Sequence, residues 1–230
     1  MFKINNKSII FFSLLITIFS SLISSVKAIE FPDAPEREAP QSTAAGGRRG
    51  GCVSGTIPIM ALTPNQDNAI TTVSAQPDLF VYIPTTRAKL LQFILKDNGG
   101  NTIDNQEIAI PQNDRVMRIN VGDKVNLETG KKYTWEVSLI CNPMAINTST
   151  YTKGSIERVT LEDNIKKELS AQQDALKKAE IYASNKVWQE TISLVAQVKE
   201  SQPQQWQELL TSVGLENLAD KQFAQEETPE

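Results

Sequence analysis

The stretch Gly130-Lys-Lys-Tyr-Thr-Trp-Glu-Val-Ser-Leu-Ile-Cys-Asn-Pro143 decides the fold of this chain. Apolar side chains occupy every second position from Tyr133 to Cys141, and Thr, Glu and Ser fill most of the positions between them. Because successive side chains of a strand point to opposite faces, this alternation predicts a half-buried antiparallel strand. It is the longest clean alternation in the chain, and we expect it to be the central strand of a β domain.

Short runs rich in β-branched and aromatic residues on both sides of this strand predict a β domain over residues 52–160. Between two of the runs, Asp97-Asn-Gly-Gly-Asn101 predicts a tight hairpin turn, because Asn and Gly tolerate positive φ. Seven or eight short strands at this spacing favour a β-sandwich. The expected strands are Thr56–Leu62, Ala69–Ser74, Asp78–Ile83, Leu90–Lys96, Ile103–Ile110, Arg115–Val121, the Tyr133 strand and Tyr151–Val159.

The run Leu127-Glu-Thr-Gly-Lys-Lys-Tyr133 resembles the tyrosine corner of immunoglobulin and fibronectin type III sandwiches. In that corner, a Tyr near the start of a strand reaches back to upstream backbone. An antibody domain has its second Cys two residues after this Tyr, whereas Cys141 lies farther along the chain from Tyr133. The resemblance therefore implies an architecture closer to fibronectin type III, without the antibody disulfide.

After Leu161 the apolar period changes from two to about 3.6 residues, which predicts helices over residues 161–219. Ser170 and Gln173 have the spacing of a capping box, which marks the start of a helix. The fold class we expect is mainly β, with a small C-terminal helical hairpin or three-helix segment. The expected helices run from Ser170 to Ser184, from Val187 to Lys199 and from Pro203 to Gly214.

Ala179, Tyr182, Trp188 and Pro203 have the spacing of one tetratricopeptide repeat. A single repeat cannot bury its apolar face alone, so we expect the sandwich or a partner to cover it. The end of the chain, residues 220–230, is polar and acidic. We expect this tail to be disordered.

The first 28 residues have the pattern of a secretory signal peptide. Lys3 and Lys7 precede an uncharged apolar run, and Val26-Lys-Ala28 supplies the small residues for cleavage after Ala28. The apolar run is near the lower length of a membrane span, so an uncleaved N-terminal anchor is the alternative. Residues 29–51 are rich in Pro, Gly and small polar residues, and they predict a flexible linker.

Removal of residues 1–28 leaves 20 basic and 27 acidic side chains, a net charge of −7. An acidic chain without a basic block is poorly suited to nucleic-acid binding. The two cysteines are Cys52 and Cys141, and export favours a disulfide between them, with two unpaired buried thiols as the alternative. We expect no transmembrane span after signal cleavage.

The chain contains no histidine, which excludes Ser-His-Asp and Cys-His catalysis and His-bearing zinc sites in their usual forms. Two cysteines are too few for a Cys-only metal site. We therefore expect no catalytic residue, no cofactor and no metal. A carboxylate pair for glycoside hydrolysis is the remaining catalytic option, although a solvated loop and strand face is the simpler interpretation. The candidate carboxylates are Asp97, Asp104, Glu107 and Asp114.

Four aromatic residues are candidates for contact with a ligand or partner. Phe80 and Tyr82 are expected on opposite sides of one strand, which leaves one ring on the outer face to stack on a sugar or a partner. Trp188 and Trp206 are expected in the core, with partly exposed interface anchors as the alternative.

Several motifs together resemble a family of exported cyanobacterial proteins catalogued as domain of unknown function 928. The resemblance covers residues 51–219 and implies an exported protein without an assigned activity, so it supplies no functional residues. The motifs are Gly51-Cys52, Phe80-Val-Tyr-Ile-Pro84, the Gly130 to Pro143 stretch, Gly154-Ser-Ile-Glu-Arg-Val159, Tyr182-Ala183, Val187-Trp188 and Trp206-Gln-Glu-Leu-Leu-Thr-Ser-Val-Gly-Leu215.

These features together predict an exported, disulfide-tied, non-enzymatic binding or scaffolding module of the periplasm or cell envelope. Its partner would be an envelope protein or glycan. The alternative is an envelope protein that binds glycan, or that hydrolyses it with paired carboxylates. Both sandwiches and helical hairpins typically present binding surfaces, which is an analogy at the level of the fold.

Overall fold

The computed structural model describes residues 28–32, 52–64, 67–121, 125–142 and 150–225. The predicted signal peptide, apart from Ala28, and residues 33–51 of the predicted linker lie outside these ranges. The described strands are β1 (Met60–Ala61), β2 (Ala69–Thr72), β3 (Asp78–Ile83), β4 (Leu90–Lys96), β5 (Thr102–Ala109), β6 (Arg115–Asn120), β7 (Lys132–Leu139) and β8 (Tyr151–Arg158).

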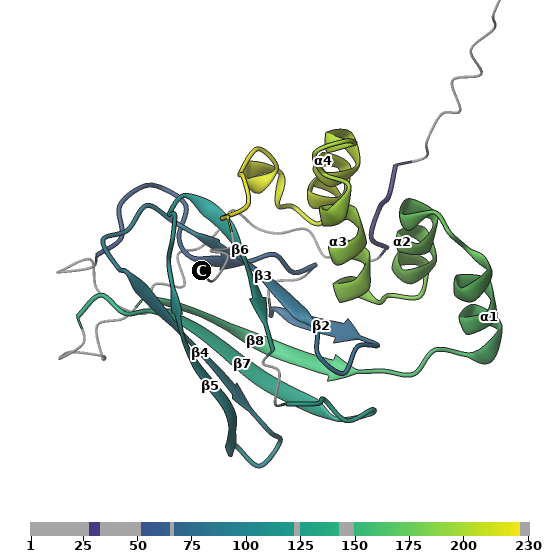
Figure 1. Ribbon diagram of the computed structural model, residues 1–230, viewed down its shortest axis with the longest axis horizontal. Coiled ribbons are helices and arrows are strands. Elements are labelled where there is room, and N and C mark those ends of the chain that lie inside the picture. Colours follow the sequence, from purple (N-terminus) through teal and green to yellow (C-terminus); the bar gives the residue numbers. More distant parts are fainter. Residues whose placement is uncertain (1–27, 33–51, 65–66, 122–124, 143–149, 226–230) are drawn as a thin grey trace, which may run out of the picture.

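The strands form two sheets that pack against each other (Figure 1). The five-stranded sheet has the order β2-β8-β7-β4-β5, and the three-stranded sheet has the order β1-β3-β6. β7, predicted from the Gly130 to Pro143 stretch, is the third of five strands and is therefore central, as expected. β2 runs parallel to β8, whereas the other ladders are antiparallel. The mainly β class is confirmed, and the fibronectin type III likeness stays a prediction.

The inner faces of the two sheets meet in an apolar core. Trp135 and Phe93 fill it from the five-stranded sheet, and Val81 and Ile119 fill it from the three-stranded sheet. Gly154 stands opposite Trp135 in the ladder between β7 and β8, and a Cβ atom there would lie 2.6 Å from the indole Cζ2. The glycine therefore leaves the space in which the indole ring lies against β8.

The helices follow β8. The first helix was not among the expected helices. It is separate from the second because the backbone is extended at Gln172, between the two. The capping-box prediction was wrong: Asp174, not Ser170, caps the second helix by accepting hydrogen bonds from two backbone N–H groups. No helix within the described ranges is long and apolar enough to cross a membrane. The helices are α1 (Asp163–Ala171), α2 (Ala175–Ser184), α3 (Trp188–Gln197) and α4 (Pro203–Ser212), followed by the short 3-10 helix η2 (Glu216–Leu218).

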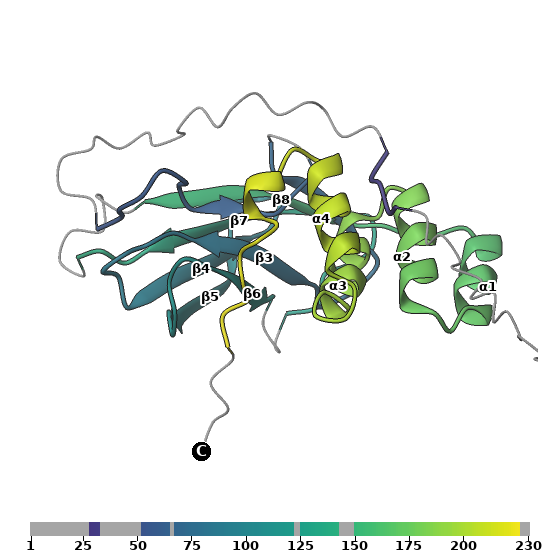
Figure 2. The ribbon, with the colours of Figure 1, turned by 90° about the horizontal axis from the view of Figure 1, so that it is seen from above.

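The helix α3 attaches the helical segment to the sandwich (Figure 2). The Glu190 carboxylate accepts hydrogen bonds from the Thr72 hydroxyl at 2.7 Å and from the Ser74 N–H at 3.0 Å, at the end of β2. The Trp188 indole N–H donates to the Leu62 carbonyl at 2.9 Å. These polar contacts surround a continuous apolar cluster that includes both sheets and α2 to α4. The tetratricopeptide likeness stays a prediction.

The start of the predicted linker is buried instead of being a free tether. Ile29 is 1% exposed, and the Phe31 ring packs edge-on against Trp188 with a centroid distance of 5.0 Å. The Phe31 N–H also donates to the Ser212 hydroxyl at 3.1 Å. This short segment is thus docked onto the helices by a ring contact with α3 and a hydrogen bond to α4.

A disulfide joins Cys52 to Cys141, as predicted, with the two Cα atoms 5.4 Å apart. It connects the entry of the β domain to the second residue beyond β7. At the other end of β7, the Tyr133 hydroxyl accepts a hydrogen bond from the Glu128 N–H at 3.0 Å. This is the backbone contact expected from the tyrosine-corner resemblance.

Reduction of the disulfide, or Cys141→Ser, should lower the thermal unfolding temperature by roughly 10 °C. The bond closes a loop with a sequence separation of 89 residues, and constraint of the unfolded chain by such a loop stabilises the fold by ~4 kcal/mol. Calorimetry of the oxidised, reduced and Cys141→Ser chains checks this. An unfolding temperature that does not change with reductant would contradict it.

Candidate functional site

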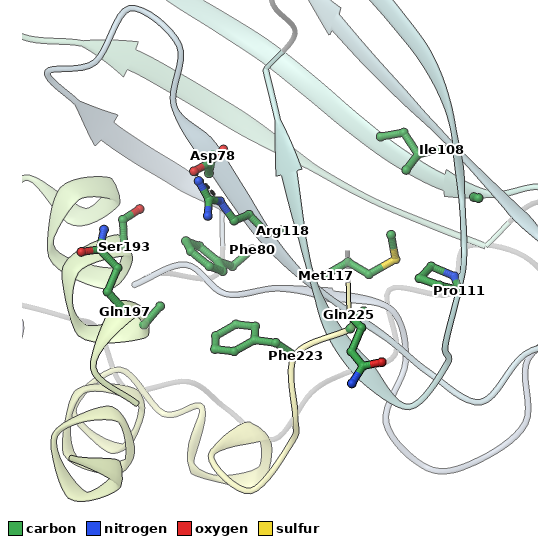
Figure 3. Close-up of a pocket in the computed structure, with 13 residues that line it drawn as sticks. Asp78, Phe80, Ile108, Pro111, Met117, Arg118, Ser193, Gln197, Phe223 and Gln225 are labelled. Atoms are coloured by element: carbon green, nitrogen blue, oxygen red, sulfur yellow. Dashed lines mark hydrogen bonds and ion pairs between the residues drawn. The ribbon is translucent and has the colours of Figure 1, made fainter. Parts of the chain in front are cut away.

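A groove of about 640 Å³ opens on the side of the sandwich where both sheets end (Figure 3). β6 is the last strand of the three-stranded sheet and β5 is the last strand of the five-stranded sheet, and both border the groove. The helix α3 and residues 223–225 form its remaining walls. A volume of this size falls within the range of ~300–1,000 Å³ that small-ligand sites occupy.

Apolar side chains line the groove in two groups, one on each side of β6. The first group, which we call the outer subsite, consists of Phe80, Ala196 and Phe223. The second group, the inner subsite, consists of Ile108, Pro111 and Met117. Figure 3 shows Phe80 and Phe223 together on one side of the strand, and Pro111 and Ile108 on the other.

The outer subsite depends on the C-terminal segment, residues 220–225, which was predicted to be part of a disordered tail. Phe223 forms a parallel bridge with Val116, and its ring packs against Trp206 at 5.3 Å and Phe80 at 6.0 Å between centroids. The Lys199 ammonium lies 4.8 Å from the centroid of the same ring. A lone aromatic residue in a polar tail is the signal that could have indicated this docking.

Asp114 holds the C-terminal segment in place. Its carboxylate accepts hydrogen bonds from the Lys221 ammonium and from the Tyr82 hydroxyl, both at 2.6 Å. Both contacts lower the pKa of the Asp114 carboxyl, and the hydrogen bond from Lys221 has the larger effect. Burial, together with the Asp114 carboxylate, raises the pKa of Tyr82.

Lys199 makes a second attachment from the end of α3. Its ammonium donates to the Lys221 carbonyl and lies over the rings of Trp206 and Phe223. Burial lowers the pKa of this lysine, but the carbonyl and the two ring faces favour its charged form. The segment is therefore fixed by two cations and an aromatic ring.

Polar groups in the groove are few and mostly paired. Asp78 is the one carboxylate among the described lining residues, and it accepts hydrogen bonds from Arg118 at 2.6 Å and Asn120 at 3.0 Å. Ser193 and Gln197 contribute a hydroxyl and an amide from α3. An apolar groove with a few hydrogen-bonding groups is suited to recognition.

The structure engages three of the four candidate carboxylates in hydrogen bonds with neighbouring side chains or backbone. Asp97 accepts hydrogen bonds from Asn101 within the hairpin turn, and Asp104 accepts one from Gln106. Glu107 projects from β5, and Asp114 is engaged by the C-terminal segment. Within the described ranges, no cluster of three or more acidic or cysteine side chains has the arrangement of a metal site.

Phe80 and Tyr82 are two positions apart in β3, so they share one face, and the prediction that they face opposite sides was wrong. Both are buried, at 5% and 3% exposure, beneath the C-terminal segment. Trp188 and Trp206 are each 1% exposed, which confirms the expected core packing.

A second groove, of about 870 Å³, lies along the five-stranded sheet and is more polar. Lys96, Lys132 and Lys153 border it together with Tyr151 and Glu136. The Lys153 ammonium lies 5.9 Å from the centroid of the Tyr151 ring. Lysines around a partly exposed aromatic ring are suited to an anionic or hydroxyl-rich ligand.

The fold and the first groove define a mainly β protein with two packed sheets and four helices, and with an apolar groove at the open side of its sheets. The sequence profile of the family Domain of Unknown Function 928 (DUF928) matches residues 44–223. The chain belongs to this family, and the match extends beyond the predicted range at both ends; cyanobacterial origin and export stay predictions. No curated protein matches the chain, and no solved structure does.

Asp114→Asn should loosen the C-terminal segment and lower the unfolding temperature at pH 7 by about 2 °C, as expected for a partly exposed ion pair. Asp114 has a φ of 57°, which Asn tolerates, so the change removes mainly the charge. Because folding lowers the pKa of Asp114, its contribution is present at neutral pH and is lost as the pH falls through the folded value.

The difference in unfolding temperature between wild type and Asp114→Asn should therefore shrink as the pH falls below about 3.9, the ordinary pKa of an aspartate, and through the lower folded value. Thermal melts of both chains from pH 7 to pH 2 measure it. A difference that stays constant over this range would show that the charge of Asp114 does not hold the segment.

Proposed function

We propose that the chain is an exported module of the periplasm or cell envelope that binds or scaffolds a partner without catalysing a reaction. The observation that supports this best is the groove between β5, β6, α3 and the C-terminal segment. Its two apolar subsites and few polar groups have the composition of a recognition site. The disulfide and the N-terminal signal pattern support export.

The polar groups of the groove favour binding over catalysis. The Asp78 carboxylate is already engaged in an ion pair with Arg118. Ser193 is the one hydroxyl among the described lining residues, and the chain has no histidine to activate it. The groove thus offers shape, apolar contact and hydrogen bonds, which are sufficient for a binding site.

A second candidate function is binding of an envelope glycan, supported by the groove on the five-stranded sheet. An acidic polysaccharide could run along this sheet and meet the ammonium groups of Lys96, Lys132 and Lys153. Exposed charges contribute modestly and are screened by salt. We therefore place this candidate second, behind the apolar groove.

Ser193→Trp should prevent the mature chain, residues 29–230, from retaining its partner from an envelope extract of the source organism. Ser193 lines the groove from α3, so an indole ring there fills it. Gln207→Trp is the matched control, because it adds the same ring at an exposed position of α4 outside the groove. We expect one stoichiometric protein on wild type and on the control, and about tenfold less on Ser193→Trp, as measured by quantitative mass spectrometry.

Glycan-degrading treatment of the extract separates the two candidate functions. The second groove would be supported if capture of the partner requires intact glycan. In that case Lys153→Glu should reduce capture and Ser193→Trp should leave it unchanged. Equal capture by wild type and Ser193→Trp, with no dependence on glycan, would reject the first groove as the binding site.

A further inference from the structure

We propose that the groove receives an extended peptide segment of a partner protein, which adds as a short strand to the free edge of β6 and inserts two successive apolar side chains. The proposal rests on the proposed function and deepens it, because it names the class of partner for the same groove. It follows from the direction of the main-chain groups of β6 and from the position of the two subsites.

The ladder between β3 and β6 directs the main chain of Arg118 into the groove. The Phe80 carbonyl accepts a hydrogen bond from the Leu62 N–H at 2.9 Å, so the main-chain groups of Phe80 point toward β1. Arg118 stands opposite Phe80 in the antiparallel ladder. Opposite residues in such a ladder point their main-chain groups either toward each other or away from each other. The N–H and C=O of Arg118 therefore point away from β3, and no described residue pairs with them.

The chain itself shows that this edge accepts extended backbone. The Val116 N–H donates to the Gln222 carbonyl, and the Ala224 N–H donates to the Val116 carbonyl, both at 2.9 Å. This is the pattern of an added parallel strand, and it stops after one bridge. Arg118 is the next residue of β6 whose main-chain groups face the same way.

The far end of the open edge is partly closed. The Gln106 amide reaches across from β5 and donates to the Asn120 carbonyl at 3.3 Å. Among the outward-facing residues of β6, Arg118 is thus the one with both its N–H and its C=O open. An antiparallel strand would pair with these two groups through one residue, and a parallel strand through the two residues on either side of the one opposite Arg118.

The two subsites are placed where the side chains of an added strand would go. Successive residues of a strand point to opposite faces. Phe80 and Met117 lie on opposite faces of the three-stranded sheet, since Met117 pairs with Val81, which faces the core. A strand on β6 would therefore place one side chain in the outer subsite and its neighbour in the inner subsite. Strand addition combines main-chain hydrogen bonds with side-chain pockets in this way.

A random heptapeptide library displayed on phage, selected against the mature chain, tests the proposal. We expect enrichment of peptides with two adjacent apolar residues, and loss of these peptides on Ser193→Trp. Enriched peptides are then synthesised and titrated against Arg118→Pro and Arg118→Ala. Proline removes the outward N–H of an edge position without loss of a ladder bond, whereas alanine removes the side chain and keeps the N–H.

Binding should fall about tenfold or more on Arg118→Pro and change little on Arg118→Ala, since a lost main-chain hydrogen bond is equivalent to ~1–1.5 kcal/mol. Circular dichroism confirms that the proline chain folds. If it does not fold, peptides methylated at single backbone nitrogens are titrated against the wild-type chain instead. Methylation should weaken binding only at the peptide amide that donates to the Arg118 carbonyl.

The proposal is overturned if no peptide is enriched. It is also overturned if neither Arg118→Pro nor backbone methylation weakens peptide binding. The proposed function can survive this result, because capture of the envelope partner is measured separately with Ser193→Trp. If Ser193→Trp abolishes capture of the envelope partner but no peptide is selected, the groove binds its partner by a mode other than strand addition.

Discussion

Burial of β3 on both faces is the constraint on which the rest of the structure depends. Every residue from Leu79 to Ile83 is buried, although an antiparallel sheet commonly leaves one face in water. Val81 packs into the sandwich, whereas Phe80 and Tyr82 need cover on the other side. Burial of each large side chain stabilises the fold by ~1.5–3 kcal/mol, and the helical and C-terminal segments provide that cover. The sandwich and helices therefore share one apolar cluster.

Strand positions could be predicted from the sequence because alternation is local, and β7 with its neighbours followed the pattern closely. The unbroken apolar run of β3 also indicates cover on both faces, a signal that the assignment of Phe80 and Tyr82 to opposite sides missed. The parallel pairing of β2 with β8 had no such signal, because residues far apart in the sequence set it. Similarly, Phe223 stands alone in a polar tail, and only the aromatic surface formed by Phe80 and Trp206 explains its docking.

The groove is harder to predict than the fold, since its walls come from β3, β5, β6, α3 and the C-terminal segment. No local pattern brings these elements together. The open main-chain groups of Arg118 are harder still, because no residue type encodes them and they follow from the pairing of its neighbours. Sequence reasoning concentrated on carboxylates and aromatic rings, whereas the proposed peptide binding depends on backbone at a sheet edge.

An open sheet edge favours aggregation, and the structure limits that risk without closing the groove. The C-terminal segment covers β6 at Val116, and Gln106 caps the edge at Asn120. Between them Arg118 presents a charged side chain, paired with Asp78, of the kind that discourages indiscriminate strand pairing. One residue of free edge is too short to template another copy of the sheet by itself. In the proposed complex, a strand would also have to fill both apolar subsites to gain enough contact, so specificity would arise from the combination of backbone and pockets.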